Sequence, residues 1–198
     1  MHSIVAGQFQ LSRIFSFPRF VDVLRLNSVG FVQPGHWDDP YENPLEGKTV
    51  EDGEGKRFIL SSYSNTYYAQ CWWHGPESDA MWRIYSPNRQ GVLVSCQAAS
   101  LHQSLSSSLQ HPTQQLHIGR VQYLPALELQ RQLQDPQFIQ SLVHSRMYYP
   151  DGLPVLLKKR DSFMHENEIR VIMSDHISRD PVPAALSSTA ILANCFLT

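Results

Sequence analysis

The sequence predicts a single α+β domain over residues 1–198, in which short strands mix with helices. Its length is the first observation, because one domain typically uses about 100 to 200 residues. Composition is the second: 42% of the residues are hydrophobic and 17% are charged, which suffices for a core. Third, strand-like and helix-like segments follow one another without a regular βαβ period, and this favours α+β.

The N-terminal part is expected to start with a strand over 8–17, where apolar and polar residues interleave before Pro18. A short helix over 19–27, ending near Gly30, follows from its near-helical apolar spacing. Further expectations are a strand at 31–32, a breaker-rich loop at 34–44 and an exposed connection at 46–56.

The central part is expected to contain a buried strand over 67–73 (YYAQCWW), because aromatic residues dominate it. A helix over 77–85 should place Ala80, Met81, Ile84 and Tyr85 on one face. Further expectations are a strand at 91–96, a helix at 97–110, a strand at 117–123 and helices within 126–146 interrupted at Pro136.

The C-terminal part is harder to interpret. Residues 153–163 fit a helix or a strand, whereas 168–173 (EIRVIM) alternate as in a strand. Residues 174–198 form a C-terminal extension whose pattern predicts no role.

Charge and cysteine content restrict the function classes. The formal net charge is −2, so no global basic field would attract nucleic acid. Three widely spaced cysteines do not suggest a disulfide framework, and no leader or apolar run of about 20 residues is present. We therefore expect a cytoplasmic protein without a membrane partner. No metal site is predicted, because no pair of ligands has helical spacing.

Familiar catalytic signatures such as GxGxxG, the Walker loop, GxSxG, HExxH and CxxC are absent from the sequence. Three constellations remain. The first is the aromatic block, comprising Cys71, Trp72, Trp73, Glu77, Ser78, Met81, Trp82 and Tyr85. Its aromatic residues are typical of a core, and Glu77 or Ser78 would satisfy first-turn amides. Alternatively, the block forms a wall on which a ring-bearing ligand stacks.

The second constellation is the run 158–170, KKRDSFMHENEIR. If Glu168 begins a strand, Glu166 and Glu168 project on the same side, since side chains repeat every two residues. Two such carboxylates can divide orientation and proton acceptance between them. The alternative is a solvated loop with a weak surface pair between Glu168 and Arg170.

The third constellation is the acidic loop 36–42 (HWDDPYE). Acidic residues before proline are ordinary turn chemistry, which is the favoured interpretation. A ligand role would require the loop to fold over a pocket. A metal nuclease using Asp38, Asp39 and Glu42 is the weaker alternative, because these carboxylates crowd one turn.

In this order the motifs resemble the bacterial domain-of-unknown-function 2971 family. The resemblance rests on the aromatic strand 13–17, the DP-aromatic-E turn at 39–42, the CW…ES-x-x-MW-x-x-Y block and the E-x-E-x-R element ending at Arg170. It covers residues 13–173.

The order of elements in this family is also similar to that of ADP-ribosyltransferases, including bacterial toxins and phage-defence effectors. This resemblance implies a split β-sheet, NAD as a substrate, and a late glutamate as the catalytic residue. Glu168 and Glu166 hold the matching positions. The positions implied to bind NAD are Arg13, Phe15, Ser16, Trp72, Ser78, Trp82 and Tyr85. The chain departs from the pattern because Ser16 replaces a basic residue and no Ser-Thr-Ser follows.

Two function hypotheses therefore stand beside each other. In the first, the protein transfers ADP-ribose from NAD to a macromolecule, either protein or nucleic acid, and a neutralising antitoxin is expected by analogy. In the second, the protein is a non-catalytic module that senses a ligand or binds a partner, with the aromatic block as its core.

Overall fold

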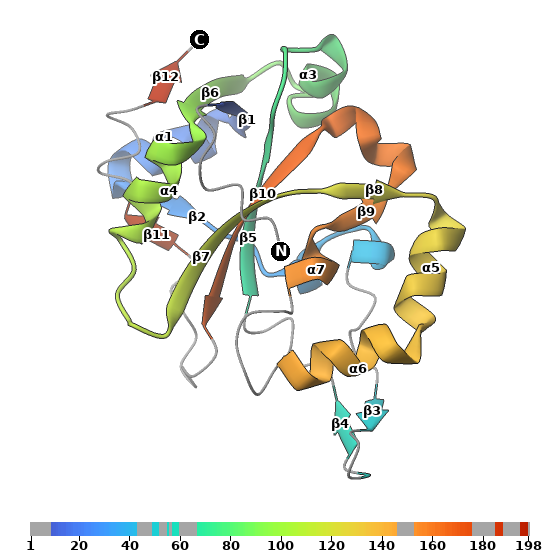
Figure 1. Ribbon diagram of the computed structural model, residues 1–198. Helices are drawn as coiled ribbons and strands as arrows, with labels where there is room; N and C mark the ends of the chain where they lie inside the picture. The colour runs from blue at the N-terminus through green and yellow to red at the C-terminus, as the bar shows by residue number, and fades with distance from the viewer. Residues whose placement is uncertain are drawn as a thin grey trace. The chain divides into compact units, whose positions relative to one another are not determined.

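The computed structural model describes residues 9–42, 49–51, 55, 57–59, 67–145, 153–175, 185–187 and 195–197. It contains both helices and strands, which confirms the α+β prediction (Figure 1). Contacts divide the chain into two compact units, each assembled from separate segments. The sheet unit comprises Met1–Val32, Ala69–Arg120 and Glu166–Thr198, and the helical unit comprises Gln33–Tyr68 and Val121–His165. One domain over 1–198 stays a prediction.

A six-stranded sheet forms the centre of the sheet unit, with the strand order β12-β6-β1-β5-β10-β7. Each pairing for which the register is defined is antiparallel. The strands are β1 (Gln10–Ser16), β5 (Tyr67–Trp73), β6 (Gly91–Gln97), β7 (Gln114–Arg120), β10 (Glu168–Asp175) and β12 (Cys195–Leu197). Strands from the beginning, middle and end of the sequence, β1, β5 and β10, are therefore neighbours.

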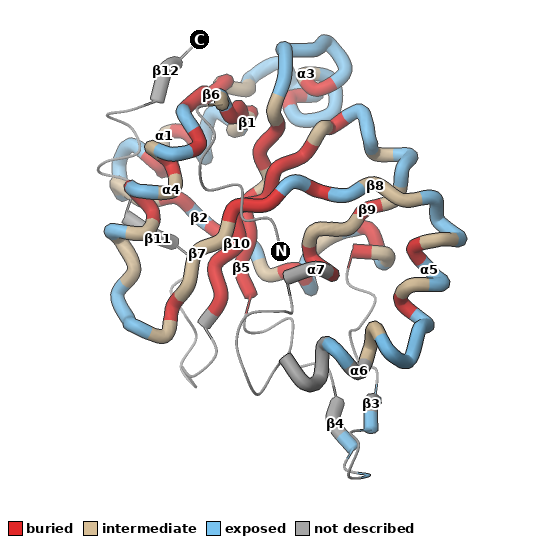
Figure 2. Tube along the Cα trace, viewed as in Figure 1, coloured by how far each residue is buried: buried red, intermediate tan, exposed pale blue. Residues whose placement is uncertain are grey.

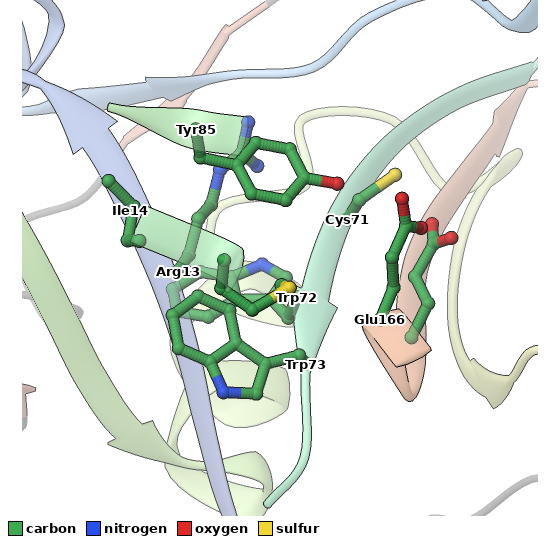
Figure 3. Close-up of a pocket in the computed structure, with 9 residues that line it drawn as sticks. Arg13, Ile14, Cys71, Trp72, Trp73, Tyr85 and Glu166 are labelled. Carbon is green, nitrogen blue, oxygen red and sulfur yellow. The ribbon is translucent and has the colours of Figure 1, made fainter. Parts of the chain in front are cut away.

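The sheet opens between β1 and β5. Strand β1 pairs with β6 along its whole length, from Gln10 opposite Gln97 to Ser16 opposite Gly91. In contrast, the described residues of β1 and β5 share one register pair, Ser12 opposite Trp73, beyond which the strands separate (Figure 3).

The core of the sheet unit follows from its central strands. In β5 all residues except Cys71 are buried, without the alternation of a half-exposed strand, since β5 lies in the interior of the sheet. Strand β10 is buried to a similar extent (Figure 2). Because apolar burial is the main favourable term in folding, these strands anchor the unit.

Three helices pack on this sheet: α1 (Phe17–Leu26), α3 (Asp79–Tyr85) and α4 (Ala98–Ser106). Helix α1 has Pro18 in its first turn and ends at Asn27, whose φ of 50° is left-handed. The Ser78 hydroxyl caps α3 by accepting a bond from the Met81 amide at 3.3 Å. A short ladder of β2 (Ser28–Gly30) and β11 (Ala185–Ser187) lies in the same unit.

The helical unit contains α5 (Ala126–Gln134), α6 (Pro136–Ser145), α7 (Leu153–Leu156), the parallel pair β8 (Gln122–Leu124) and β9 (Lys158–Arg160), and the antiparallel pair β3 (Thr49–Glu51) and β4 (Arg57–Ile59). Three 3-10 turns are η1 (Pro34–His36), η2 (Pro40–Glu42) and η3 (Asp161–Glu166), the last ending in the sheet unit. The buried hydrophobic cluster of the helical unit comprises Leu129, Leu133 and Val155.

Several predicted elements are confirmed with shifted ends. The first strand ends at Ser16 and the helix begins at Phe17, two residues early, because proline is favoured in a first helical turn. The 97–110 helix ends at Ser106, because the hydroxyls of Ser107 and Ser108 bond the Ser104 carbonyl and compete with helical bonds. The 117–123 strand divides into β7 and β8.

Other expectations are wrong. The expected strand at 31–32 is an isolated bridge from Val32 to Ala69, with β2 just before it. Within 46–56, residues 49–51 form β3, while 46–48, 52–54 and 56 lie outside the described residues. The predicted apolar face of the 77–85 helix buries Met81 alone, since Ala80, Ile84 and Tyr85 are exposed. In the C-terminal extension, β12 forms an edge of the main sheet.

Candidate functional site

A small cavity occupies the opening between β1 and β5 in the sheet unit (Figure 3). Its volume is about 100 Å³. The lining residues come from β1, β5, α3 and the start of β10: Arg13, Ile14, Cys71, Trp72, Trp73, Met81, Tyr85, Glu166 and Glu168. Ligand pockets usually measure roughly 300–1,000 Å³, so this cavity is too small to enclose a whole ligand of ordinary size.

Arg13 brings a positive charge to the cavity from β1. The residue is half-buried, but its Nη1 atom is buried and has no hydrogen-bond partner among the described residues. Burial lowers the pKa of Arg13, while Cys71, Tyr85 and Glu168 oppose the shift. A buried guanidinium with a free donor is suited to bind an anionic or hydrogen-bond-accepting group.

Glu168 is held by a buried two-pronged ion pair. Arg170 Nε lies 2.7 Å from Glu168 Oε1, and Arg170 Nη2 lies 3.2 Å from Oε2. Both residues are almost fully buried, Arg170 with 0% and Glu168 with 3% exposure. The pair fixes the carboxylate, whose oxygens accept more than two bonds in total. The hypothesis of a solvated surface pair is therefore wrong.

Cys71 contacts this carboxylate from β5. Burial raises the pKa of Cys71 to about 12, and Glu168 adds to the shift through its charge and a hydrogen bond from the thiol. Arg170 and Arg13 act in the opposite direction. The thiol is therefore protonated at neutral pH and acts as a hydrogen-bond donor. In this form it is a poor nucleophile, because the thiolate is the nucleophilic form.

Glu166 reaches the cavity from a different local structure than the sequence suggested. It ends η3, and Asn167 adopts a left-handed φ of 42° before β10 begins at Glu168. The Asn167 side chain donates to the His74 carbonyl and accepts from Arg120 Nη1 at 3.0 Å, which anchors this turn. The two glutamates thus line the same cavity, as expected, although the chain between them is not extended (Figure 3).

Aromatic side chains form the walls. Trp72 and Trp73 are buried on β5, and Trp73 packs in a cluster with Ile14, Met81 and Leu93. Tyr85 is partly exposed on α3, and its hydroxyl points toward Cys71 (Figure 3). The result is a flat-walled space beside two carboxylates.

The cavity brings together five of the nine predicted site residues: Arg13, Trp72, Tyr85, Glu166 and Glu168. The other four lie outside its lining. Phe15 stacks edge-on against Trp72 at 6.3 Å, and Ser16 precedes α1 without a capping bond. Ser78 caps α3, while the Trp82 indole donates to Glu77 Oε1 at 2.5 Å.

The acidic loop has a structural role within the helical unit. Asp39 Oδ1 accepts from the Tyr41 amide at 3.1 Å, which confirms the expected turn chemistry. Asp39 Oδ2 pairs with Arg160 Nε at 3.0 Å, and Glu42 Oε1 pairs with Lys159 Nζ at 3.1 Å. Two of the three loop carboxylates, Asp39 and Glu42, are therefore bound to the basic strand β9.

Within the described ranges, no three His, Cys, Asp or Glu side chains gather as a metal site would require. Nor does any helix in this part of the chain combine the length and apolar character needed to cross a bilayer.

Comparison with known proteins gives one family. A model described as "Protein of unknown function (DUF2971)" matches residues 81–171, a range that begins within α3 and ends within β10. The chain resembles the DUF2971 family. No curated protein and no solved structure matches the chain.

Proposed function

We propose that the protein is an NAD-consuming ADP-ribosyltransferase that transfers ADP-ribose to a macromolecule. One observation carries the proposal: Glu166 and Glu168 line the same cavity as Arg13, whose Nη1 has no hydrogen-bond partner among the described residues. The strand order supports it, because the early basic strand, the middle strand and the late glutamate strand are neighbours.

The cavity suits the nicotinamide end of NAD in both size and charge. A single ring fits a volume of about 100 Å³ between the walls of Trp72 and Tyr85, and the rest of the dinucleotide would lie outside. The nicotinamide ring of NAD is cationic, so the Glu166 carboxylate would attract it, whereas the charge of Glu168 is largely balanced by Arg170. Arg13 would hold an anionic group of the same ligand with its free donor.

The proposed reaction breaks the bond between the nicotinamide nitrogen and ribose C1′. Nicotinamide leaves with the electron pair as a neutral molecule, and positive charge develops on the ribose, as in glycoside cleavage. Glu168, fixed by Arg170, would accept a bond from a ribose hydroxyl and stabilise that charge. The acceptor attacks C1′ and gives its proton to Glu166.

The proposal is tested with the purified full chain, a cell extract, and NAD labelled in its adenosine half. We expect nicotinamide release, label in macromolecules, and loss of both in Glu166→Gln and Glu168→Gln. Glu128→Gln is the matched control, because this carboxylate lies in the helical unit on α5. No release and no transfer by the wild type would overturn the proposal.

The second candidate function is a non-catalytic binding module. The buried Glu168–Arg170 pair favours it, because such a pair also serves structure alone. This hypothesis predicts that Glu168→Gln lowers stability but leaves the activity of the folded protein unchanged, whereas Trp82→Ala unfolds the protein. The acidic loop is a poor ligand-recognition element in this version, since two of its three carboxylates, Asp39 and Glu42, are paired.

A further inference from the structure

The sheet unit contains a second, larger cavity that the proposed reaction does not use. Its volume is about 440 Å³, within the usual size range of ligand pockets. It lies where β1 and β5 are still paired, and its buried floor consists of Ser12, Trp73, Leu93 and Ser95. The segment 74–77 and Gln10 form its rim.

The side chain of Trp73, which lines the floor, carries an unused hydrogen-bond donor. The Nε1 atom of Trp73 is buried and has no hydrogen-bond partner among the described residues. The residue as a whole is 5% exposed. In Figure 3 this nitrogen lies on the side of the ring away from Cys71 and Glu166. An unsatisfied buried donor destabilises the protein, so a ligand that accepts this bond recovers part of that free energy.

Two serine hydroxyls add adaptable polarity. Ser12 Oγ and Ser95 Oγ lie 2.8 Å apart and share one hydrogen bond. Two hydroxyls carry two protons, so one proton remains for donation and lone pairs remain for acceptance. Leu93 and the indole ring of Trp73 supply apolar surface beside them.

The charge of the lining restricts the ligand further. Among the described residues that line this cavity, none is Lys or Arg. Glu77 at the rim is negatively charged, and its carboxylate accepts from the Trp82 indole. A phosphate or carboxylate group would therefore enter without a Lys or Arg partner in this part of the lining, at a high desolvation cost. We expect the buried part of the ligand to be uncharged.

We propose that this second cavity binds an uncharged nucleobase-type ring. Such a ring stacks on an aromatic surface and carries acceptors and donors on its edge. One edge acceptor would take the Trp73 N–H, and the serine hydroxyls would meet the neighbouring edge atoms. The proposal does not depend on NAD cleavage, because free nucleosides suffice as ligands.

The test follows the indole N–H signals of the ¹⁵N-labelled full chain by NMR during titration with adenosine, guanosine, cytidine or uridine. The Trp73 signal, assigned with Trp73→Phe, should move saturably with at least one nucleoside. The Trp72 signal should stay, because its indole already donates to Gln70 Oε1 at 3.2 Å. Inorganic phosphate should move neither signal.

Two variants complete the test by calorimetry. Trp73→Phe should weaken nucleoside binding by about tenfold through loss of one hydrogen bond. Ser95→Val, which does not touch the first cavity, should weaken it as well. An unmoved Trp73 signal with every nucleoside would overturn the proposal. NAD is titrated in the same way, and a response to NAD without a response to any nucleoside would also overturn the proposal, because the cavity would then belong to the dinucleotide site.

Discussion

The buried ion pair of the candidate site should dominate its stability. Replacing Arg170 by Met removes the guanidinium but keeps an apolar side chain of similar length, leaving the Glu168 carboxylate uncompensated. The side chains in this pair are only 1% and 4% exposed, so solvent cannot replace the lost partner. Breaking one partner of a buried pair costs about 3–5 kcal/mol, and we expect this loss in the free energy of unfolding.

Urea denaturation followed by circular dichroism measures this loss. Arg83→Met is the matched control: Arg83 pairs with Asp79 at 2.6 Å, but both side chains are 79% exposed, so the loss should stay below about 1 kcal/mol. The double variant Glu168→Leu/Arg170→Met should recover part of the stability, because neither member of the pair is left without its partner. Equal losses of unfolding free energy in Arg170→Met and Arg83→Met would show that burial does not make the Glu168–Arg170 pair more important than an exposed pair.

Three further predictions concern single positions. Cys71 should react with iodoacetamide about 1,000-fold more slowly in the folded than in the unfolded protein at pH 8, because its pKa rises from about 9 to about 12; equal rates by mass spectrometry would contradict this. Gly91→Ala should lose about 1–3 kcal/mol by overpacking, since the new Cβ would lie 2.7 Å from Ile14 Cγ2; an unchanged melting temperature would show that the strand yields. Arg160→Gln should lower stability by about 1–3 kcal/mol through the buried Asp39 carboxylate, and Asp39→Asn in the same chain should restore part of it.

Periodicity predicted the strands and helices whose neighbours impose one dominant pattern. The run 67–73 is apolar on both faces and forms β5, and Pro136 separates two helices as expected. Periodicity did not predict element ends or pairings that depend on a few individual side chains or on distant segments. Serine hydroxyls end α4 early, and β12 joins the sheet through long-range pairing that no local pattern contains.

The spacing of residues along the chain also predicted part of the site. The E-x-E spacing indicated that Glu166 and Glu168 share a side, and both line the cavity. Cys71 as a bond donor and Arg170 as the fixed partner of Glu168 were not assigned to the site, because their roles depend on which strands become neighbours. The alternation of Glu168 and Arg170 was the available signal, since residues two apart share one face of a strand.

The most direct measurement is the rate of nicotinamide release from NAD by the purified protein, compared between wild type and Glu168→Gln at equal folded concentration. We expect the wild type to release nicotinamide and the rate to fall roughly 100-fold or more in the variant, because Glu168 would act as an electrostatic or acid–base group. An equal rate in both proteins, or no release by the wild type, would contradict it.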